Sequence, residues 1–239
     1  MLVLHSSRPR HVVVLTLFFL LLTSTSFARS PYPAWDWIEH YYENPQPEKF
    51  ITSIYELSRN GYFELPGHTV LAMGFIASVF RDNPDQLDEW LLYCRSLPDS
   101  HKRLIVSALW CSGHPKGEEY LRFYAESVVG PRMASRLLRT LESSPPLTTR
   151  TIDSSRVVYF RWGAFMATGD VESLTEIFLA LNSIEGLTAS DRWWIARKAS
   201  RHQDVVAHCR AELDRAPSPL RESMETVIIS ADLTDSPSS

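Results

Sequence analysis

The chain has 239 residues, of which 44% are hydrophobic, and its 24 basic and 28 acidic side chains give a formal net charge of −4. This composition is ordinary for a folded protein and argues against a disordered chain or one with many membrane spans. The acidic balance argues against nucleic-acid binding, which depends on clustered positive charge.

The N-terminal segment has the order of a secretory signal peptide. Arg8 and Arg10 form a basic flank before the apolar run 12–22, and small residues follow up to Ala28. As a helix this run would span about 16 Å, well short of a hydrocarbon core of about 30 Å. We therefore predict a signal peptide over residues 1–28, cleaved after Ala28, and an exported protein, periplasmic or secreted, without stable membrane insertion after cleavage. The alternative is an uncleaved segment that tethers the protein to a membrane.

Polar residues at helical spacing follow the predicted cleavage site. Asp36, Glu39, His40 and Glu43 are three or four residues apart, so they would share one face of a helix. A histidine with carboxylates at such spacings can bind a divalent metal or support acid–base chemistry. Asp36, His40 and Glu43 are the candidate ligands, although the sequence does not indicate a further one. The main interpretation, however, is a charged, solvated outer face on a terminal helix, and the metal site is the speculative alternative.

The rest of the chain has the periodicity of amphipathic helices. Apolar residues recur three or four positions apart, as in Leu87, Trp90, Leu91 and Cys94. Turn signals recur mostly about every 15 residues, which predicts helices of about 11 to 14 residues joined by short turns. We predict an all-α protein in which antiparallel helix pairs stack as a short α-solenoid. A compact helical bundle is the alternative.

Prolines and polar residues suggest how the chain is divided. Pro145 and Pro146 cannot continue a helix, and the C-terminal end is polar. The predicted parts are an N-terminal helical half, a loop, a C-terminal helical half and a disordered tail, over residues 29–142, 143–152, 153–230 and 231–239. Helix starts are predicted at the N-caps Asp153 and Asp170 and at a capping box formed by Thr188 and Asp191.

The three cysteines are predicted to be small buried hydrophobic residues rather than disulfide partners. In an antiparallel helix pair Cys94 and Cys111 would lie about 13 Å apart along the axis, beyond the ~7 Å limit for a disulfide. Cys209 would then remain unpaired as well.

Two groups of residues suit a binding surface. Trp193 and Trp194 are adjacent on a predicted helix, and Arg132, Arg136 and Arg139 form a stripe on another. Aromatic and arginine side chains anchor many protein interfaces. The alternatives are core packing for the tryptophans and a solvated face for the arginines.

One segment resembles a known repeat. From Phe165 to Phe178 the chain resembles the middle of a tetratricopeptide repeat, because these two aromatics and Gly169 match its spacing, whereas Leu174 stands where the family has a small residue. Residues 162–170 (WGAFMATGD) are also similar to a motif of uncharacterised exported helical proteins of bacteria. The resemblance implies helix-pair packing and no particular activity.

Sequence motifs for catalysis or cofactor binding are missing. The chain lacks a Gly-x-Ser-x-Gly elbow, a His-Glu-x-x-His pair, a phosphate-binding loop and a dinucleotide-binding fingerprint. We predict no cofactor and assign no catalytic residue. Binding of a protein or peptide partner in the cell envelope is the predicted function, and a metal-dependent enzyme that uses the Asp36/His40 face is the alternative.

Overall fold

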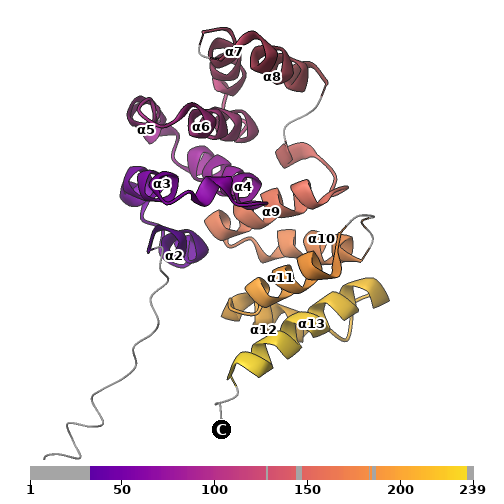
Figure 1. Cartoon of the computed structure of the whole chain (residues 1–239). Coiled ribbons are helices and arrows are strands. Elements are labelled where there is room, and N and C mark those ends of the chain that lie inside the picture. The colour runs from indigo at the N-terminus through magenta and orange to yellow at the C-terminus, as the bar shows by residue number, and fades with distance from the viewer. Residues whose placement is uncertain (1–32, 128, 144–146, 183, 185–186, 236–239) are drawn as a thin grey trace, which may run out of the picture. The chain divides into compact units, whose positions relative to one another are not determined.

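The computed structural model describes residues 33–235 except 128, 144–146, 183 and 185–186, and the elements in this part of the chain are helices (Figure 1). This confirms the all-α prediction. The predicted signal peptide and its cleavage site at Ala28 lie outside the described residues. The α-helices are α2 (Pro33–Glu39), α3 (Phe50–Arg59), α4 (His68–Asp82), α5 (Leu87–Cys94), α6 (Asp99–Cys111), α7 (Gly117–Ser127), α8 (Pro131–Ser143), α9 (Ser155–Thr168), α10 (Val171–Leu181), α11 (Ala189–Ala199), α12 (Gln203–Glu212) and α13 (Ser218–Asp235). Short 3-10 helices are η1 (Tyr41–Glu43), η2 (Pro47–Lys49), η3 (Tyr62–Glu64), η4 (Pro84–Gln86) and η5 (Leu147–Thr149).

Local capping explains several helix starts. The Asp191 amide donates to the Thr188 hydroxyl (3.1 Å) and the Thr188 amide donates to the Asp191 carboxylate (2.9 Å), which confirms the predicted capping box. Asp170 caps α10 as predicted, by accepting from two backbone amides of its first turn. The prediction for Asp153 is wrong, because Ser154 occupies the N-cap of α9 while the Asp153 carboxylate accepts from the Ser154 hydroxyl.

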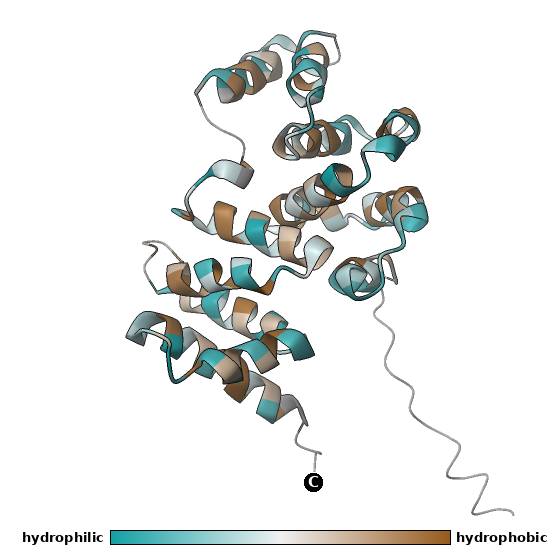
Figure 2. Ribbon diagram, turned by 180° about the vertical axis from the view of Figure 1, so that it is seen from behind, coloured by the Kyte–Doolittle hydropathy of each residue, from teal (hydrophilic) through white to brown (hydrophobic). Residues whose placement is uncertain are grey.

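Helix α4 lies at the centre of the apolar core. Every residue from Leu71 to Phe80 is buried, which is the pattern of a helix enclosed on all sides rather than of one with a single buried face. Its neighbours are α6, η3 and, most extensively, α9. Figure 2 shows apolar residues on α4 and α9, where the two helices lie against each other.

Two glycines allow α4 and α9 to touch through their backbones. A methyl group at Gly74 would overlap the carbonyl oxygen of Phe160, and one at Gly163 would overlap the carbonyl oxygen of Leu71. Each glycine therefore accommodates the backbone of the other helix, at a separation that a side chain would prevent.

The α4–α9 contact joins segments that are far apart in sequence. From α4 the packing proceeds through α6 and α7 to α8, and from α9 it proceeds through α10 to α13, which also contacts α11 and α12. The described residues of the two predicted halves, 34–142 and 153–230, thus belong to one compact unit. Neighbouring helices are not always consecutive in the chain, and stacking as a regular solenoid stays a prediction.

The C-terminal helix extends beyond the predicted boundary. Helix α13 continues to Asp235, so residues 231–235 are helical rather than part of a disordered tail. Val227 and Ala231 are buried one turn apart, and Asp232 accepts a hydrogen bond from Arg210 (2.7 Å). These contacts hold the last turns against α12. Among the described helices, none combines the length and the apolar character needed to cross a membrane.

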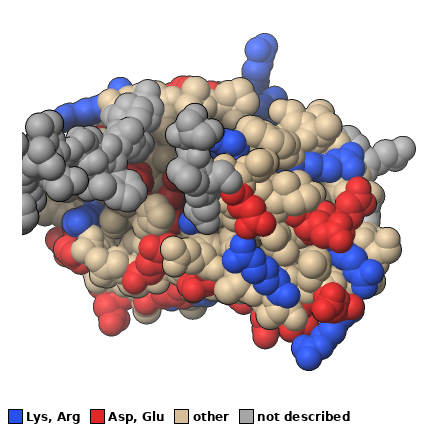
Figure 3. Space-filling model, turned by 90° about the horizontal axis from the view of Figure 1, so that it is seen from below, with Lys and Arg blue, Asp and Glu red and all other residues tan. Residues whose placement is uncertain are grey.

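Acidic and basic side chains are mixed on the surface. Figure 3 shows Lys and Arg interspersed with Asp and Glu among the described atoms of one face. Some of the surface charges form ion pairs, such as Arg122 with Glu118 (2.8 Å). The prediction that nucleic acid is not a partner, which follows from the net charge of −4, stays a prediction.

All three cysteines are buried, as predicted, and Cys94 and Cys209 are free thiols. Burial raises the pKa of the Cys94 thiol to about 12 and those of Cys111 and Cys209 to about 11. Because the thiolate is the form that binds metals and reacts, these side chains act as small apolar groups.

Candidate metal centre

The predicted polar face after the signal segment is divided by the end of a helix. Helix α2 ends at Glu39, the backbone at His40 leaves the helical region (φ −114°, ψ 14°), and Glu43 belongs to the 3-10 turn η1. The prediction that these residues and Asp36 share one helical face is therefore wrong. Pro45, close behind η1, disfavours a continuous helix here. Glu39 turns away from His40 and Glu43, and Asp36 is exposed outside the group that they form.

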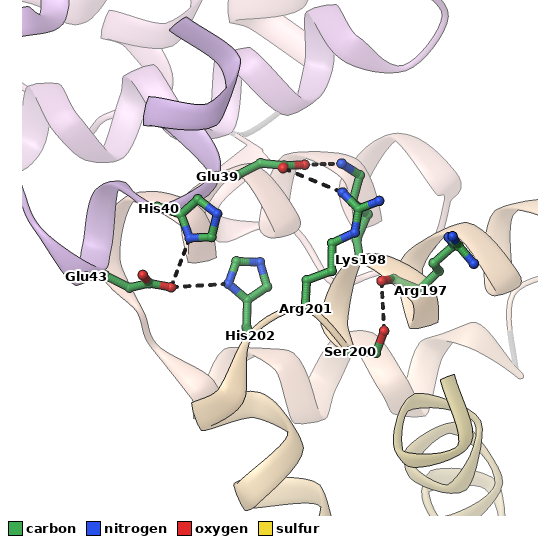
Figure 4. A network of polar contacts seen from close by, with 8 residues as sticks. All are labelled: Glu39, His40, Glu43, Arg197, Lys198, Ser200, Arg201 and His202. Carbon is green, nitrogen blue, oxygen red and sulfur yellow. Dashed lines mark hydrogen bonds and ion pairs between the residues drawn. The ribbon is translucent and has the colours of Figure 1, made fainter. Parts of the chain in front are cut away.

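His40 and Glu43 instead meet a histidine from the far end of the chain. The Nδ1 atom of His40 lies 3.1 Å from Oε1 of Glu43, and Nδ1 of His202 lies 3.8 Å from the same oxygen (Figure 4). One potential ligand atom from each of the three residues lies within 4.8 Å of the other two. The side chains of His40 and Glu43 are each 45% exposed, whereas that of His202 is 3% exposed. The group is open to solvent on one side and anchored on the other.

His202 is held by its position in the chain and by aromatic neighbours. It is the N-cap residue of α12, and its amide donates to the carbonyl of Ala199 (3.1 Å) in the turn after α11. Its ring packs edge-on against Trp162 and Phe165, with centroids 6.0 and 5.4 Å away. The Tyr42 hydroxyl lies 3.2 Å from its Nδ1 atom. The imidazole thus has little freedom to rotate.

The surroundings of His202 keep it uncharged. Burial, aided by the nearby His40, lowers the pKa of His202 to about 4, although the carboxylates of Glu39 and Glu43 oppose this. Burial, and next the Glu43 carboxylate, raise the pKa of Tyr42, so its hydroxyl stays protonated. At neutral pH Tyr42 can donate to the unprotonated Nδ1 of His202. The neutral imidazole is also the form that binds metal ions.

A separate ion group lies beside the histidines. The buried carboxylate of Glu39 is bonded to the ammonium group of Lys198 and lies 3.8 Å from the Arg201 guanidinium (Figure 4). Lys198 also lies 5.7 Å from the centre of the Trp35 ring. Since the charge of Glu39 is used by these cations, Glu43 is the carboxylate that remains for the two histidines.

The geometry is close to that of a three-ligand metal site. Ligand atoms bound to one tetrahedral zinc ion at 2.0–2.1 Å lie about 3.3 Å from one another. The separations of 3.1 and 3.8 Å at Glu43 bracket this value, and the widest separation, which does not exceed 4.8 Å, has to shrink by at most about 1.5 Å. His40 is exposed and lies between two short helices, so it can make this movement. Two histidines and one carboxylate leave a fourth position for water or a ligand.

The predicted tryptophans lie in different environments. Trp193 is 54% exposed on α11, with the Arg197 guanidinium 5.2 Å from its ring centre. Trp194 is half-buried and packs edge-on against Tyr159, at 5.6 Å. Core packing thus accounts for Trp194, and Trp193 stays a predicted surface contact.

The predicted arginine stripe is exposed on α8. Arg132, Arg136 and Arg139 all lie on the surface, and Nε of Arg139 donates to the carbonyl of Ser135 (3.1 Å). The structure does not bring these arginines together with the tryptophans, which lie on α11. Their role in binding stays a prediction.

A serine and a carboxylate also contact a second buried histidine, away from the candidate metal centre. Ser58 Oγ lies 2.7 Å from Nδ1 of His101, whose Nε2 lies 2.5 Å from Oε1 of Glu64. This order of contacts is that of a nucleophile, base and acid. However, the groove that His101 and Glu64 line does not include Ser58, so we interpret the contacts as the hydrogen bonding that a buried histidine requires.

Sequence reasoning identified two of the three convergent residues and missed His202. Spacing rules detect partners on one helix, and His202 is separated from Glu43 by most of the chain. Comparison with family models, with curated proteins and with solved structures found no match.

Proposed function

We propose that this protein binds one divalent transition-metal ion, with Zn²⁺ the best match, through His40, Glu43 and His202. The observation that carries the proposal is the convergence of two imidazoles and a carboxylate from separate segments within 4.8 Å. As part of the same proposal, a signal peptide over residues 1–28 would place this activity in the periplasm or outside the cell.

Three features support the assignment to a zinc-class ion. Imidazole nitrogen and carboxylate oxygen are the ligands of many zinc sites that keep an open coordination position. The low pKa of His202, about 4, leaves this imidazole unprotonated at neutral pH, so binding there does not have to displace a proton. The aromatic rings behind His202 provide an apolar wall, which strengthens the attraction between the ion and Glu43.

Isothermal titration of the purified, chelator-treated protein with Zn²⁺ at neutral pH tests the proposal. We expect one ion per chain and a dissociation constant below about 10 μM, a modest affinity for a site with three protein ligands. Titration with Co²⁺ should give the visible absorption of a four-coordinate ion. His40→Ala and Glu43→Gln change exposed side chains, so these variants should fold normally and lose at least tenfold in affinity.

His208 supplies the matched control. It lies on α12, two turns beyond His202, and is not part of the convergent group. His208→Ala should therefore bind Zn²⁺ as tightly as the unaltered protein. The proposal is overturned if the unaltered protein does not bind Zn²⁺ in this range, or if His208→Ala weakens binding as much as His40→Ala does.

A further inference from the structure

An apolar groove lies between α5, α6 and α7, away from the proposed metal centre. It has a volume of about 410 Å³, and its floor includes Cys94, Ile105 and Tyr124. Cys94 and Ile105 belong to the main core, whereas Tyr124 belongs to a smaller cluster that includes Val106 and Leu121 and has residues of α8 packed against it. The groove thus follows the seam between two apolar clusters.

Large apolar side chains stand exposed on opposite rims of this groove. Leu92 of α5 is 58% exposed and Phe123 of α7 is 61% exposed. Single exposed hydrophobic residues are common, but two large ones that line the same apolar concavity indicate an interaction site.

One arginine at the groove carries a positive charge that no acidic side chain of the described residues pairs with. Lys102 is paired with Asp99 (2.7 Å), and Asp88 lies 3.7 Å from Lys116. Arg95, which also lines the groove, has no ion pair with an acidic side chain in the part of the chain that the structure describes. A bound molecule with a carboxylate near Arg95 would form an ion pair with its guanidinium.

We infer that the groove binds an amphipathic helix of a partner protein, with its apolar stripe between Leu92 and Phe123 and an acidic side chain at Arg95. An apolar groove with helical walls is a common receptor for such helices, and arginine and large aromatic residues are typical anchors of interfaces. Helix α7 has 11 residues and is about 16 Å long, which matches about three turns of a bound helix. This binding is independent of the metal ion.

Selection from a displayed library of amphipathic helices of about 15 residues, with the full protein as bait, tests the inference. Enriched peptides should carry apolar residues at positions i, i+3, i+4 and i+7 together with an Asp or Glu. In fluorescence anisotropy, Phe123→Ala and Arg95→Glu should each weaken binding of such a peptide at least tenfold. Replacing the acid of the peptide by lysine should restore binding to Arg95→Glu and weaken binding to the unaltered protein.

The controls use residues of similar exposure. Ile229 on α13 is 58% exposed, as Leu92 is, so Ile229→Ala should leave peptide binding unchanged while Leu92→Ala weakens it. Since these side chains are exposed, circular dichroism of the variants should match that of the unaltered protein. The inference is overturned if no such peptide is enriched, or if affinity is indifferent to both Phe123→Ala and Arg95→Glu. If no peptide is enriched and dodecanoate binds in the groove instead, the occupant is a small aliphatic acid rather than a helix.

Discussion

Replacing Gly163 by alanine tests the contact between α4 and α9. An added methyl group would overlap the carbonyl oxygen of Leu71 and would lie 2.9 Å from the amide nitrogen of Phe75. Both atoms belong to the backbone of α4, so no side-chain rotation can make room. The two helices have to separate, and residues on both sides of the crossing lose contact.

The sign of the change in stability shows whether α4 and α9 touch through their backbones at Gly163. Alanine in a helix interior is favoured over glycine by about 1 kcal/mol, so without the close contact Gly163→Ala would stabilise the protein. Overpacking a tightly packed core costs about 1 to 3 kcal/mol, and here the obstacle is a backbone rather than an adjustable side chain. We therefore expect a net loss of about 2 kcal/mol or more in the free energy of unfolding.

Urea unfolding followed by circular dichroism at 25 °C measures this difference. Gly130, which precedes α8, has no neighbouring atom within 4 Å of the position a methyl group would take, so Gly130→Ala should change stability by less than about 0.5 kcal/mol. A Gly163→Ala variant that is as stable as the unaltered protein, or more stable, would refute the close backbone contact.

Three further predictions concern the metal centre. His202 has a pKa of about 4 in the folded chain and 6.5 when unperturbed, and its charged neighbours are His40, Glu39, Glu43 and Lys198. The unfolded chain therefore binds the proton more tightly than the folded chain does. The free energy of unfolding should fall by roughly 3 kcal/mol between pH 6.5 and pH 4. Urea unfolding of the chelator-treated protein should show this loss, and His202→Asn should reduce it. Tyr42→Phe removes the hydroxyl that occupies Nδ1 of His202, so the affinity for Zn²⁺ in calorimetry should rise by up to about tenfold, whereas a loss would make Tyr42 a ligand. Zn²⁺ at 100 times its dissociation constant should stabilise the fold by about 2.7 kcal/mol and raise the melting temperature by roughly 5 to 10 °C. The Asp36→Ala variant should show the same shift in melting temperature. Loss of the shift in this variant would mean that Asp36 is a ligand.

Local rules explain what the sequence could predict of the fold. Helix periodicity and the capping groups at Asp170 and Thr188 act within a few residues, so they can be read from one sequence. The α4–α9 contact depends on Gly74 and Gly163, which are 89 positions apart in the chain. The almost continuous run of apolar and small residues from 71 to 80 is a signal that could have identified α4 as enclosed on all sides.

Only the part of the candidate site that is local in sequence could be predicted. His40 and Glu43 are close in the chain, and their spacing suggested an interaction that the structure places at 3.1 Å. The end of α2 at Glu39 could not be read from the spacing of the polar residues, although Pro45 was a signal against a continuous helix. His202 lacks a local partner that would identify it as a ligand, and its approach to Glu43 requires the packing of α2, η1 and the turn before α12.

The segment 162–170 combines several of these constraints. Gly163 permits the approach of α4, and Gly169 ends α9 with φ +67° at a position where a side chain would press against Tyr42. Asp170 caps the next helix. The segment thus combines helix crossing, chain reversal and capping, and none of these depends on a particular activity.

The same segment also supports the proposed ion site. Trp162 and Phe165 form the wall against which the His202 ring packs, and Phe165 also contacts Tyr42, with ring centroids 5.2 Å apart. Helix α9 is thus the common support of η1, which carries Glu43, and of the turn that carries His202. A site whose ligands come from opposite ends of the chain needs such a shared support, because their relative position is otherwise set by two separate chain segments. Helix α9, which joins the two halves of the fold, therefore also fixes the positions of Glu43 and His202 relative to each other.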